Sequence, residues 1–430
     1  MRILVVGGGG REHALCWALR RDLPEATLFA APGNPGTAPL ATNLTIAPTA
    51  TDDLVAAAAV QRIDLTIIGP EGPLAAGLAD RMREAGRAVF GPTQAAAQLE
   101  SSKAFAKEVM RRAGIPTAES RTFSDPDLVA FRVYIEKRAV PLVVKASGLA
   151  AGKGVVICAT RPEAERVARD MLEGTSFGGA GRQIVVEDFL EGEELSVMAL
   201  TDGERIAILP PAQDHKRLGD GDTGPNTGGM GAYCPVSLAT PELLARVRHE
   251  VFEPTLREMA ARGISYQGVL YAGLMVAPDG TVRVLEFNCR FGDPEAQVVL
   301  PVLRRGATAD LAAIATGRWR PSDDRVPATG AAVTTVLAAR GYPEHPETGA
   351  AIDLPADLGP DVVVFHAGTT RDAQGTLRVS GGRVLAVTAR AGTVVEAARK
   401  SAAACARIAF DGKTYRRDIG WREMARAGAA

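Results

Sequence analysis

The opening of the chain constrains its fold more than any other stretch, because a strand pattern runs straight into four glycines and then into a helix pattern. Residues 2–6 (RILVV) have the apolar, branched composition of a buried strand, and residues 11–21 have the periodicity of a helix. Strand patterns recur at 27–31 and 63–68, with helical stretches between them. Strands that alternate with helices predict an α/β domain with a doubly wound parallel sheet, which we place at about residues 1–100.

The four glycines that follow the first strand fit an anion-binding turn better than a dinucleotide-binding turn. Backbone amides at the N-terminus of a helix can hold a phosphate group. The dinucleotide pattern G-x-G-x-x-G fails, because its third glycine would fall on Glu12 when counted from Gly7 and on His13 when counted from Gly8. This failure opposes a dinucleotide-dependent oxidoreductase. A tight turn that binds nothing stays open as the alternative.

Length and composition set further limits. A chain of 430 residues is too long for one ordinary core, so we expect two to four domains. The net charge of -1 gives no global attraction to nucleic acid or to an anionic membrane, and no apolar run approaches the roughly 20 residues of a spanning helix. The cysteines are scattered and the opening lacks the features of a signal peptide. We therefore expect a cytoplasmic protein with reduced thiols that binds neither nucleic acid nor membrane.

A glycine-rich hairpin is predicted in the second domain. Strand patterns at 141–145 and 153–158 flank a loop of small residues. The loop is not a P-loop, because three residues instead of four separate Gly148 from Gly152, and Gly154 stands where a serine or threonine would hold magnesium. A small tip rich in amide groups can fold over phosphates as a lid, with the lysine that ends the first strand beneath it. An ordinary solvated hairpin is the alternative.

An acidic segment from Glu187 to Glu194 follows a β-branched strand pattern. A bound purine needs a flat apolar slot, backbone groups for its polar edge and an acceptor for the ribose hydroxyls. An extended segment with free backbone at 187–189 and a carboxylate at Glu194 meets these needs. Because acidic residues around a turn are usually just solvated, this motif is weak by itself.

The most informative motif is LEFNCRFGDPE at 285–295. Strand alternation puts Glu286, Asn288 and Arg290 on one face, and sends Leu285, Phe287 and Cys289 to the other face. A carboxylate and an amide oxygen two residues apart can bind a hard cation such as Mg²⁺, and the arginine beside them can hold a phosphate or a carboxylate. The wet face of an edge strand is the alternative, which the neighbouring phenylalanine, glycine and proline oppose.

The rest of the chain adds a polar connection and a last mixed unit. Residues 210–231 are rich in glycine and proline, and a loop of that length is usually functional or disordered. We predict one helix over 240–262 and two strands at 268–277 and 281–288. A final unit near 328–425 shows strand patterns around 330–338, 361–366 and 383–389 and a helix pattern at 392–407.

The order of these motifs resembles the ATP-grasp superfamily and, within it, the glycinamide ribonucleotide synthetase (phosphoribosylamine–glycine ligase) family. The resemblance covers nearly the whole chain, including the segment from Arg417 to Gly420. The stretches that carry it are VVGGGGREHAL (5–15), APGNPGT (31–37), GPEGPLAAG (69–77), KASGLAAGKGV (145–155), QDHKR (213–217), GPNTGGMGAY (224–233) and EFNCRFGDPE (286–295). Cys289 stands where this family commonly has a small residue, and it should face away from the metal.

The resemblance implies an α/β ATP-grasp ligase with a doubly wound N-terminal (pre-ATP-grasp) domain at 1–100. A two-lobed ATP-grasp domain would follow at 101–325, with its lid at about 120–190, and a small mixed α/β domain at 326–430. The implied reaction joins glycine to 5-phosphoribosylamine in purine biosynthesis, with ATP as the energy source and glycyl phosphate as the intermediate. The implied partners are these small molecules alone, in a monomer or weak homo-oligomer. An ATP-grasp ligase with another substrate pair is the alternative.

The resemblance also implies roles for individual residues. Glu286 and Asn288 would hold Mg²⁺, with Mn²⁺ as a substitute, and catalysis would fall to Lys145, Asp214 and Arg290. The residues implied to contact ATP are Lys103, Lys145, Ser147, Gly148, Gly152, Gly154, Glu187, Phe189, Leu190 and Glu194, with the adenine at Glu187 and Phe189 and the ribose at Glu194. The residues implied to contact the other substrates are Gly10, Glu12, Asn34, Glu71, Asp214, Asn226, Gly229 and Arg290.

Overall fold

The N-terminal part of the chain folds into a parallel sheet, as predicted. The computed structural model describes residues 1–124, 127–150, 154–174 and 178–428. The strand order is β3-β2-β1-β4-β5, and every neighbouring pair is parallel. Ile3 to Val6 are fully buried at its centre. Its elements are β1 (Arg2–Gly7), α1 (Gly10–Asp22), β2 (Thr27–Pro32), β3 (Thr42–Asn43), α2 (Thr51–Val60), β4 (Leu65–Ile68), α3 (Glu71–Ala75), α4 (Leu78–Glu84), β5 (Ala88–Phe90) and α5 (Gln94–Ser101).

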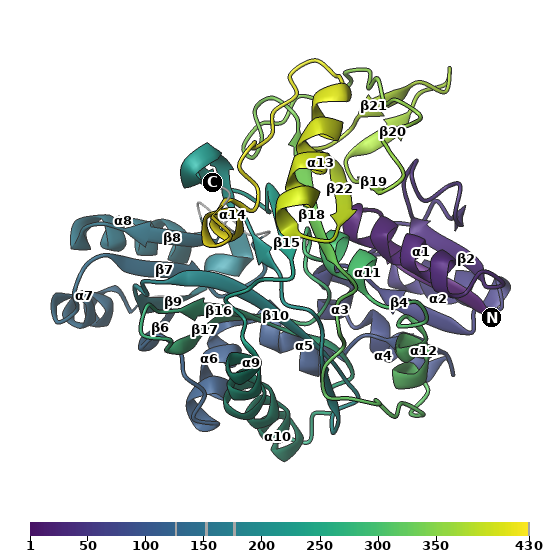
Figure 1. Ribbon diagram of the computed structural model, residues 1–430. Helices are drawn as coiled ribbons and strands as arrows, with labels where there is room; N and C mark the ends of the chain where they lie inside the picture. Colours follow the sequence, from purple (N-terminus) through teal and green to yellow (C-terminus); the bar gives the residue numbers. More distant parts are fainter. Residues whose placement is uncertain (125–126, 151–153, 175–177, 429–430) are drawn as a thin grey trace.

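A second unit, here called the hairpin sheet, projects to the left of the molecule (Figure 1). It is antiparallel, with strand order β6-β9-β7-β8, and it confirms the predicted hairpin because Lys145 pairs with Val155 across β7 and β8. Two helices cover it and form a separate apolar core with its strands. Its elements are β6 (Ser120–Ser124), α7 (Leu128–Glu136), β7 (Leu142–Ala146), β8 (Val155–Cys158), α8 (Arg161–Leu172), η1 (Gly178–Gly181) and β9 (Gln183–Asp188).

The central sheet faces the hairpin sheet and carries the motif at 285–295. It is antiparallel, with strand order β11-β10-β16-β17. Its strands are β10 (Glu193–Thr201), β11 (Ile206–Ile208), β16 (Gly268–Val276) and β17 (Val282–Asn288). The helices associated with it are α6 (Lys103–Arg112), α9 (Pro241–Val247), α10 (Glu253–Ala261) and α12 (Ala309–Ala315), while α11 (Ala296–Val302) packs against α1.

The predicted helix over 240–262 is confirmed, but its centre departs from regular α-helical geometry. A π-helical turn, η3 (Arg248–Phe252), separates α9 from α10, and the amide of Glu253 donates to the carbonyl of Arg248. Proline explains the interruption, because Pro254 lacks the amide hydrogen that a regular helix would use and its ring crowds the preceding turn.

The prediction that residues 210–231 form a loop is also wrong in part. The segment contains β12 (Gln213–Asp214), β13 (Arg217–Gly219), the short turn η2 (Asp220–Asp222) and β14 (Thr223–Asn226), and it leads into β15 (Gly231–Cys234). β13 and β14 pair with each other, while β12 and β15 join a sheet formed by the end of the chain. β15 pairs with β18, about a hundred residues further along the chain, and local composition does not reveal such a partner.

The C-terminal sheet has strand order β12-β15-β18-β22-β19 and is antiparallel. It lies at the top of the molecule, and β19 packs against α1 of the N-terminal domain (Figure 1). The strands and the helix predicted between 330 and 407 are confirmed. The elements are β18 (Ala331–Ala338), β19 (Val362–His366), β20 (Thr369–Arg371), β21 (Leu377–Val379), β22 (Arg383–Ala391), α13 (Val394–Arg407) and α14 (Trp421–Arg426).

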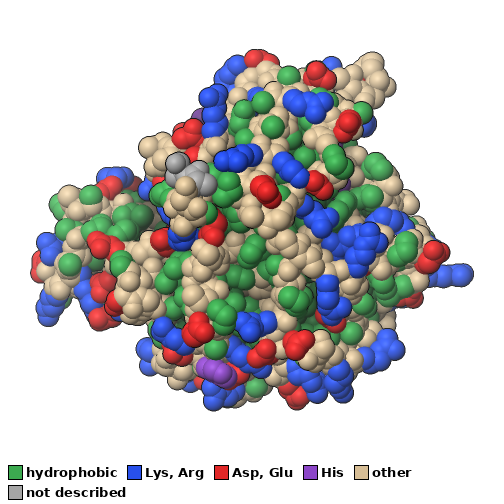
Figure 2. Space-filling view, viewed as in Figure 1, with side chains coloured by type: hydrophobic (Ala, Val, Ile, Leu, Met, Phe, Trp, Pro, Cys, Tyr) green, Lys and Arg blue, Asp and Glu red, His purple; other side chains and the backbone are tan. Residues whose placement is uncertain are grey.

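The surface agrees with the near-zero net charge. Figure 2 shows basic and acidic side chains interspersed over the visible face, without a large field of one sign. Within the described part of the chain, none of the helices combines the length and the apolar composition needed to cross a bilayer.

Candidate active site

A cleft of about 490 Å³ lies where the hairpin sheet, the central sheet and the N-terminal domain meet. Side chains from all three units border it, together with Arg383 of the C-terminal sheet. Most residues selected from the sequence are brought together here. Those that border the cleft are Glu71, Lys103, Lys145, Gly154, Glu187, Phe189, Leu190, Glu194, Asp214, Asn226, Glu286, Asn288 and Arg290.

The floor of the cleft is the end of β17. Glu286 and Asn288 lie on this strand, and Arg290 follows just beyond its last residue. Leu285 and Phe287 also border the cleft, contrary to the predicted alternation, and the pairing of β17 with β16 shifts its register at Leu285. The carbonyl of Leu285 accepts a hydrogen bond from Lys145 Nζ at 3.2 Å. Cys289 faces away as predicted, since its thiol is buried against the carbonyl of Ala96.

This floor suits a hard divalent cation. Burial alone would raise the pKa of Glu286, but the ammonium groups of Lys216 and Lys103 hold it below its ordinary value, so the carboxylate stays ionised. Asn288 adds a neutral oxygen beside it. The described residues contain no group of three or more His, Cys, Asp or Glu side chains arranged for a metal. Two protein oxygens fit Mg²⁺, which usually keeps waters and substrate phosphates as its other ligands.

Two lysines share one buried carboxylate on the hairpin side. Glu187 lies on β9, and its carboxylate is 2.9 Å from Lys145 Nζ and 3.1 Å from Lys107 Nζ. All three side chains are buried, and burial lowers the pKa of Lys107 to about 8. The side chain of Glu187 therefore orients the two cations, while Phe189 and Leu190 border the open cleft.

A second charged cluster stands on the opposite wall. Lys216 forms an ion pair with Glu194 and lies near Asp214. Burial would lower the pKa of Lys216, but the surrounding carboxylates raise it above its ordinary value. Burial raises the pKa of Asp214 to about 7. This wall thus carries one firmly held cation and one carboxyl group that titrates near neutral pH.

Arg290 is anchored by two acidic residues at the N-terminal side. Its Nη2 lies 2.8 Å from Glu100, and its Nε lies 3.5 Å from Glu71. Burial would raise the pKa of Glu71, but Arg290 and Arg11 hold it below its ordinary value. The guanidinium is therefore fixed at the junction of the N-terminal domain and the central sheet.

The glycine turn after β1 is built by its own neighbours. Glu12 accepts hydrogen bonds from the amide of Gly9 at 2.7 Å and from Arg11 Nε at 2.6 Å. Asn34 Nδ2 donates to the carbonyls of Gly8 at 2.9 Å and His366 at 2.8 Å. These side chains and Gly10 shape the turn, and Arg11 is the residue of this group that borders the cleft.

The lining of the cleft does not include the selected residues Ser147, Gly148 and Gly229. The hydroxyl of Ser147 accepts from the amide of Ala104 at 3.1 Å, and the amide of Gly148 donates to the carbonyl of Ala180 at 3.1 Å. Gly229 has a φ of +108° and packs against Pro294, so its conformation favours glycine. Gly152 lies outside the described residues.

Several residues that border the cleft were not selected from the sequence. Lys107 could have been found, because it lies one helical turn after Lys103 and shares its face of α6. Glu100 and Arg383 offered no local signal, since their importance comes from partners distant in the chain. The residues missed are Arg11, Glu100, Lys107, Lys216, Asp293, Glu295 and Arg383.

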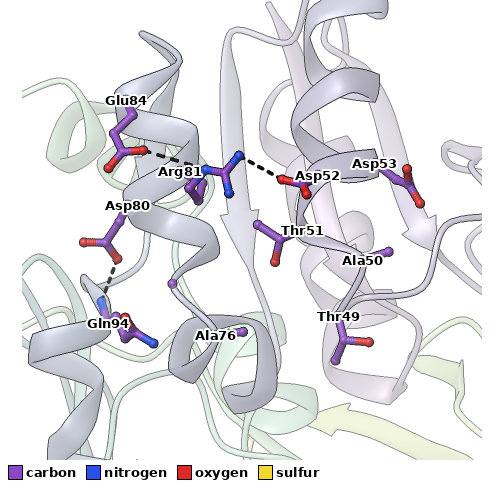
Figure 3. A pocket seen from close by; sticks show the side chains of 11 residues that line it. Thr49, Ala50, Thr51, Asp52, Asp53, Ala76, Asp80, Arg81, Glu84 and Gln94 are labelled. Atoms are coloured by element: carbon purple, nitrogen blue, oxygen red, sulfur yellow. Dashed lines mark hydrogen bonds and ion pairs between the residues drawn. The ribbon is translucent and has the colours of Figure 1, made fainter.

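Another hollow lies away from this cleft, between α2 and α4 (Figure 3). Acidic side chains line it, and Arg81 bridges two of them, at 2.8 Å from Asp52 and 3.7 Å from Glu84. Its side chains pair with one another, and none of the residues selected from the sequence borders it.

Most of the chain matches one protein family in three successive parts. Residues 1–100 match the N domain of phosphoribosylglycinamide synthetase, residues 101–296 match its ATP-grasp (A) domain, and residues 332–422 match its C domain. These matches confirm the ATP-grasp architecture predicted from the motifs.

The sequences of similar proteins align with this chain over nearly their full lengths. The chain is 47% identical over 432 residues to a phosphoribosylamine–glycine ligase of Yersinia pestis, covering 99% of this chain and 100% of the relative. It is 46% identical over 437 residues to the same enzyme of Salmonella typhimurium, covering 99% of each. A crystal structure of phosphoribosylamine–glycine ligase from Thermotoga maritima matches with a TM-score of 0.86 and 36% identity, covering 97% of this chain and 100% of that one. Biotin carboxylase from Campylobacter jejuni, at 16% identity and a TM-score of 0.75 over 99% and 95% of the two chains, shares the fold.

Proposed function

The chain belongs to the phosphoribosylglycinamide synthetase family, and we propose from this premise that its cleft ligates glycine to 5-phosphoribosylamine. ATP is cleaved to ADP and phosphate, and the product is glycinamide ribonucleotide, an intermediate of purine biosynthesis. One combined observation carries the proposal. All three domains of the family match this chain, and four residues selected from the sequence border one cleft: Lys145, Glu286, Asn288 and Arg290.

ATP is proposed to bind with its adenine against the apolar wall of the hairpin sheet. Ile157, Phe189 and Leu149 are large apolar side chains that remain 41%, 37% and 37% exposed, and all three border the cleft. Exposed apolar surface inside a cleft indicates a ligand surface, and a purine ring is flat enough to lie on it. Glu194, on the opposite wall, is the proposed partner of the ribose hydroxyls.

The phosphates of ATP are proposed to lie between Lys103, Lys145 and the end of β17, where Glu286 and Asn288 would hold Mg²⁺. Mn²⁺ has the same preference for oxygen ligands and is proposed as a substitute. A divalent ion bound there neutralises phosphate charge and lowers the barrier to phosphoryl transfer.

The residues of the chain are proposed to act mainly by positioning and charge. A carboxylate and a triphosphate repel each other, and Lys145 and Arg290 offset this repulsion in a partly dehydrated site. A carboxylate oxygen of glycine attacks the terminal phosphorus, which gives glycyl phosphate and ADP. The amine nitrogen of phosphoribosylamine then attacks the carbonyl carbon, and phosphate leaves. Asp214, with its pKa of about 7, suits the acceptor of the proton that the amine loses.

Glycyl phosphate hydrolyses easily, so water must be kept out while it exists. The tip of the β7–β8 hairpin is the proposed cover, because Leu149, Ala150 and Gly154 border the cleft. The sugar phosphate is proposed to lie toward the glycine turn and Glu71, with glycine near Asp214 and Asn226.

Membership of the family also leads us to propose domain bounds, a location and an oligomeric state. We propose domains at 1–100, 101–325 and 326–430, a cytoplasmic location and a monomer or weak homo-oligomer. The substrates are small molecules, and no nucleic acid or membrane enters the reaction.

Release of phosphate from Mg-ATP tests the function directly. With glycine and phosphoribosylamine both present, we expect release that stops when either one is omitted. Alanine in place of glycine tests the alternative of another carboxylate. Release without glycine, or faster release with alanine, would contradict the proposed substrate pair.

A further inference from the structure

Arg383 brings the C-terminal sheet into the active-site cleft. It is the first residue of β22, and it borders the cleft beside Gly228 and Asp293. Its Nη1 donates hydrogen bonds to the carbonyls of Gly228 at 2.5 Å and Asp293 at 2.9 Å. Its Nη2 lies 3.4 Å from the carboxylate of Asp293. One guanidinium thus ties the glycine-rich segment after β14 to the segment that follows Arg290.

Tyr342 holds the same glycine from its other side. The amide of Gly228 donates to the Tyr342 hydroxyl at 2.9 Å. A side chain on Gly228 would come within 3.3 Å of both the Arg383 guanidinium and the Tyr342 hydroxyl. The ring of Tyr342 packs on Gly382, where a Cβ would lie 2.3 Å from it. Both polar backbone groups of Gly228 are therefore bonded to side chains of the C-terminal domain.

We propose that Arg383 and Tyr342 are positioning residues that hold the segment Asn226–Gly229, here called the substrate loop, in its binding conformation. Asn226, Thr227 and Gly228 border the cleft. A glycine-rich segment loses more conformational entropy than others on becoming ordered, so it needs fixed partners to stay in one shape. In this proposal the docked C-terminal domain completes the site for the sugar phosphate and glycine. The naming of these substrates rests on the proposed function.

The chemistry favours arginine at this position. A planar guanidinium can donate to two carbonyls and face a carboxylate at the same time, whereas an ammonium is a point charge without this fork. Arg383→Lys should therefore restore the charge opposite Asp293 and only part of the loop geometry.

Steady-state kinetics separates positioning from a purely structural contact. For Arg383→Met we expect kcat/KM for phosphoribosylamine to fall by about 10–100-fold, the usual effect of removing a group that orients a site. Arg383→Lys and Tyr342→Phe should show smaller losses. Binding of Mg-ATP, measured by calorimetry, should stay unchanged, because the apolar wall belongs to the hairpin sheet.

Arg378→Met is the matched control. Arg378 lies on β21 of the same domain, and it likewise pairs with a carboxylate, Asp372 at 2.6 Å, and donates to a carbonyl, that of Gly349 at 2.9 Å. It does not border the cleft. Loss of kcat/KM in this variant equal to that of Arg383→Met would show a general effect of the domain and would overturn the proposal.

Hydrogen exchange gives a readout that does not depend on turnover. Amides of residues 224–231 should exchange faster in Arg383→Met and Tyr342→Phe than in the wild type, and at the wild-type rate in Arg378→Met. Unchanged exchange would overturn the positioning role even if ligase activity is present. If the wild type does not ligate glycine but the variants show the expected differences in hydrogen exchange, the proposed function is rejected and the positioning role is retained. If Arg383→Met does not fold, the Lys and Phe variants decide.

Discussion

The charged residues of the cleft hold one another in place before any substrate arrives. Glu100 is the clearest case, because its two oxygens serve different parts of the site. Oε1 lies 2.8 Å from Arg290 Nη2, and Oε2 accepts from the amide of Cys289 at 2.7 Å. Burial raises the pKa of Glu100 despite the neighbouring arginine. Glu100 therefore orients both the guanidinium and the chain that follows β17.

Glu100→Gln keeps the shape of this side chain and removes its charge. We expect kcat/KM for ligation to fall by about 10–100-fold, because Arg290 would lose its main anchor. Glu84→Gln, which removes an exposed carboxylate paired with Arg81, is the control and should be neutral. Wild-type kinetics in Glu100→Gln would contradict the anchoring role.

Glu286→Ala and Asn288→Ala test the proposed metal site. Each should reduce turnover by more than about 100-fold, the loss seen when one stabilising group of a transition state is removed, while the protein stays folded. The exposed Arg283 lies on the same strand, so Arg283→Ala is a matched control for strand structure. Normal activity in either test variant, measured by phosphate release, would count against the assignment.

At the scale of elements, the β13–β14 hairpin depends on one buried arginine. The side chain of Arg416 is fully buried, and it forms ion pairs at 2.7 Å with Asp222 and at 2.7 Å with Asp418. The amide of Gly221 donates to the same Asp418 at 2.9 Å. The last segment of the chain thus holds the hairpin that leads into the substrate loop.

Arg416→Met should lower the free energy of unfolding by about 2 kcal/mol, because two partly buried carboxylates lose a charged partner. Chemical denaturation measures this change. Adding Asp418→Asn to the variant should recover part of the loss, since it removes one unpaired charge. An unchanged free energy in the single variant would show that the arginine is not what holds the hairpin.

Hydrophobic periodicity predicted the elements whose own residues contain the pattern of buried positions. β1 is an uninterrupted apolar run, and α13 repeats its buried positions along one face. The motif at 285–295 likewise contains both proposed metal ligands. By contrast, β15, Glu100 and Arg383 depend on partners far along the chain, so no local pattern reveals them. The π turn at η3 was missed although Pro254 was visible, because a helix can absorb a proline in several ways.

At the scale of the whole molecule, the N-terminal and C-terminal domains meet at two histidines. His13 Nδ1 accepts from the amide of His366 at 2.9 Å, and the His13 ring packs edge-on against Phe365. Burial lowers the pKa of His13 to about 3, and burial likewise lowers the pKa of His366 to about 4. His215, which accepts from the amide of Gly420 at 3.2 Å, has its pKa lowered by burial to about 3. The interfaces between domains are therefore built around neutral imidazoles.

These histidines make stability depend on pH in a defined direction. An unfolded histidine has a pKa of 6.5, so below that pH the unfolded chain binds protons that the folded protein excludes. Stability is then lost as pH falls from about 6.5 toward 4, by about 1.4 kcal/mol per pH unit for each histidine. Asp214 opposes this trend, because its raised pKa lets the folded protein hold a proton that the unfolded chain releases.

Denaturation at pH 6.5 and pH 5 separates the contributions. His215→Gln should reduce the loss of stability between the two pH values by about 2 kcal/mol. The unfolded variant no longer gains, over these 1.5 pH units, the proton that the folded wild type excludes from His215. Asp214→Asn should steepen the loss, since it removes the opposing group. A slope that is the same in His215→Gln and the wild type would mean that this imidazole is protonated in the folded protein, and that the packing of the C-terminal segment tolerates a buried charge.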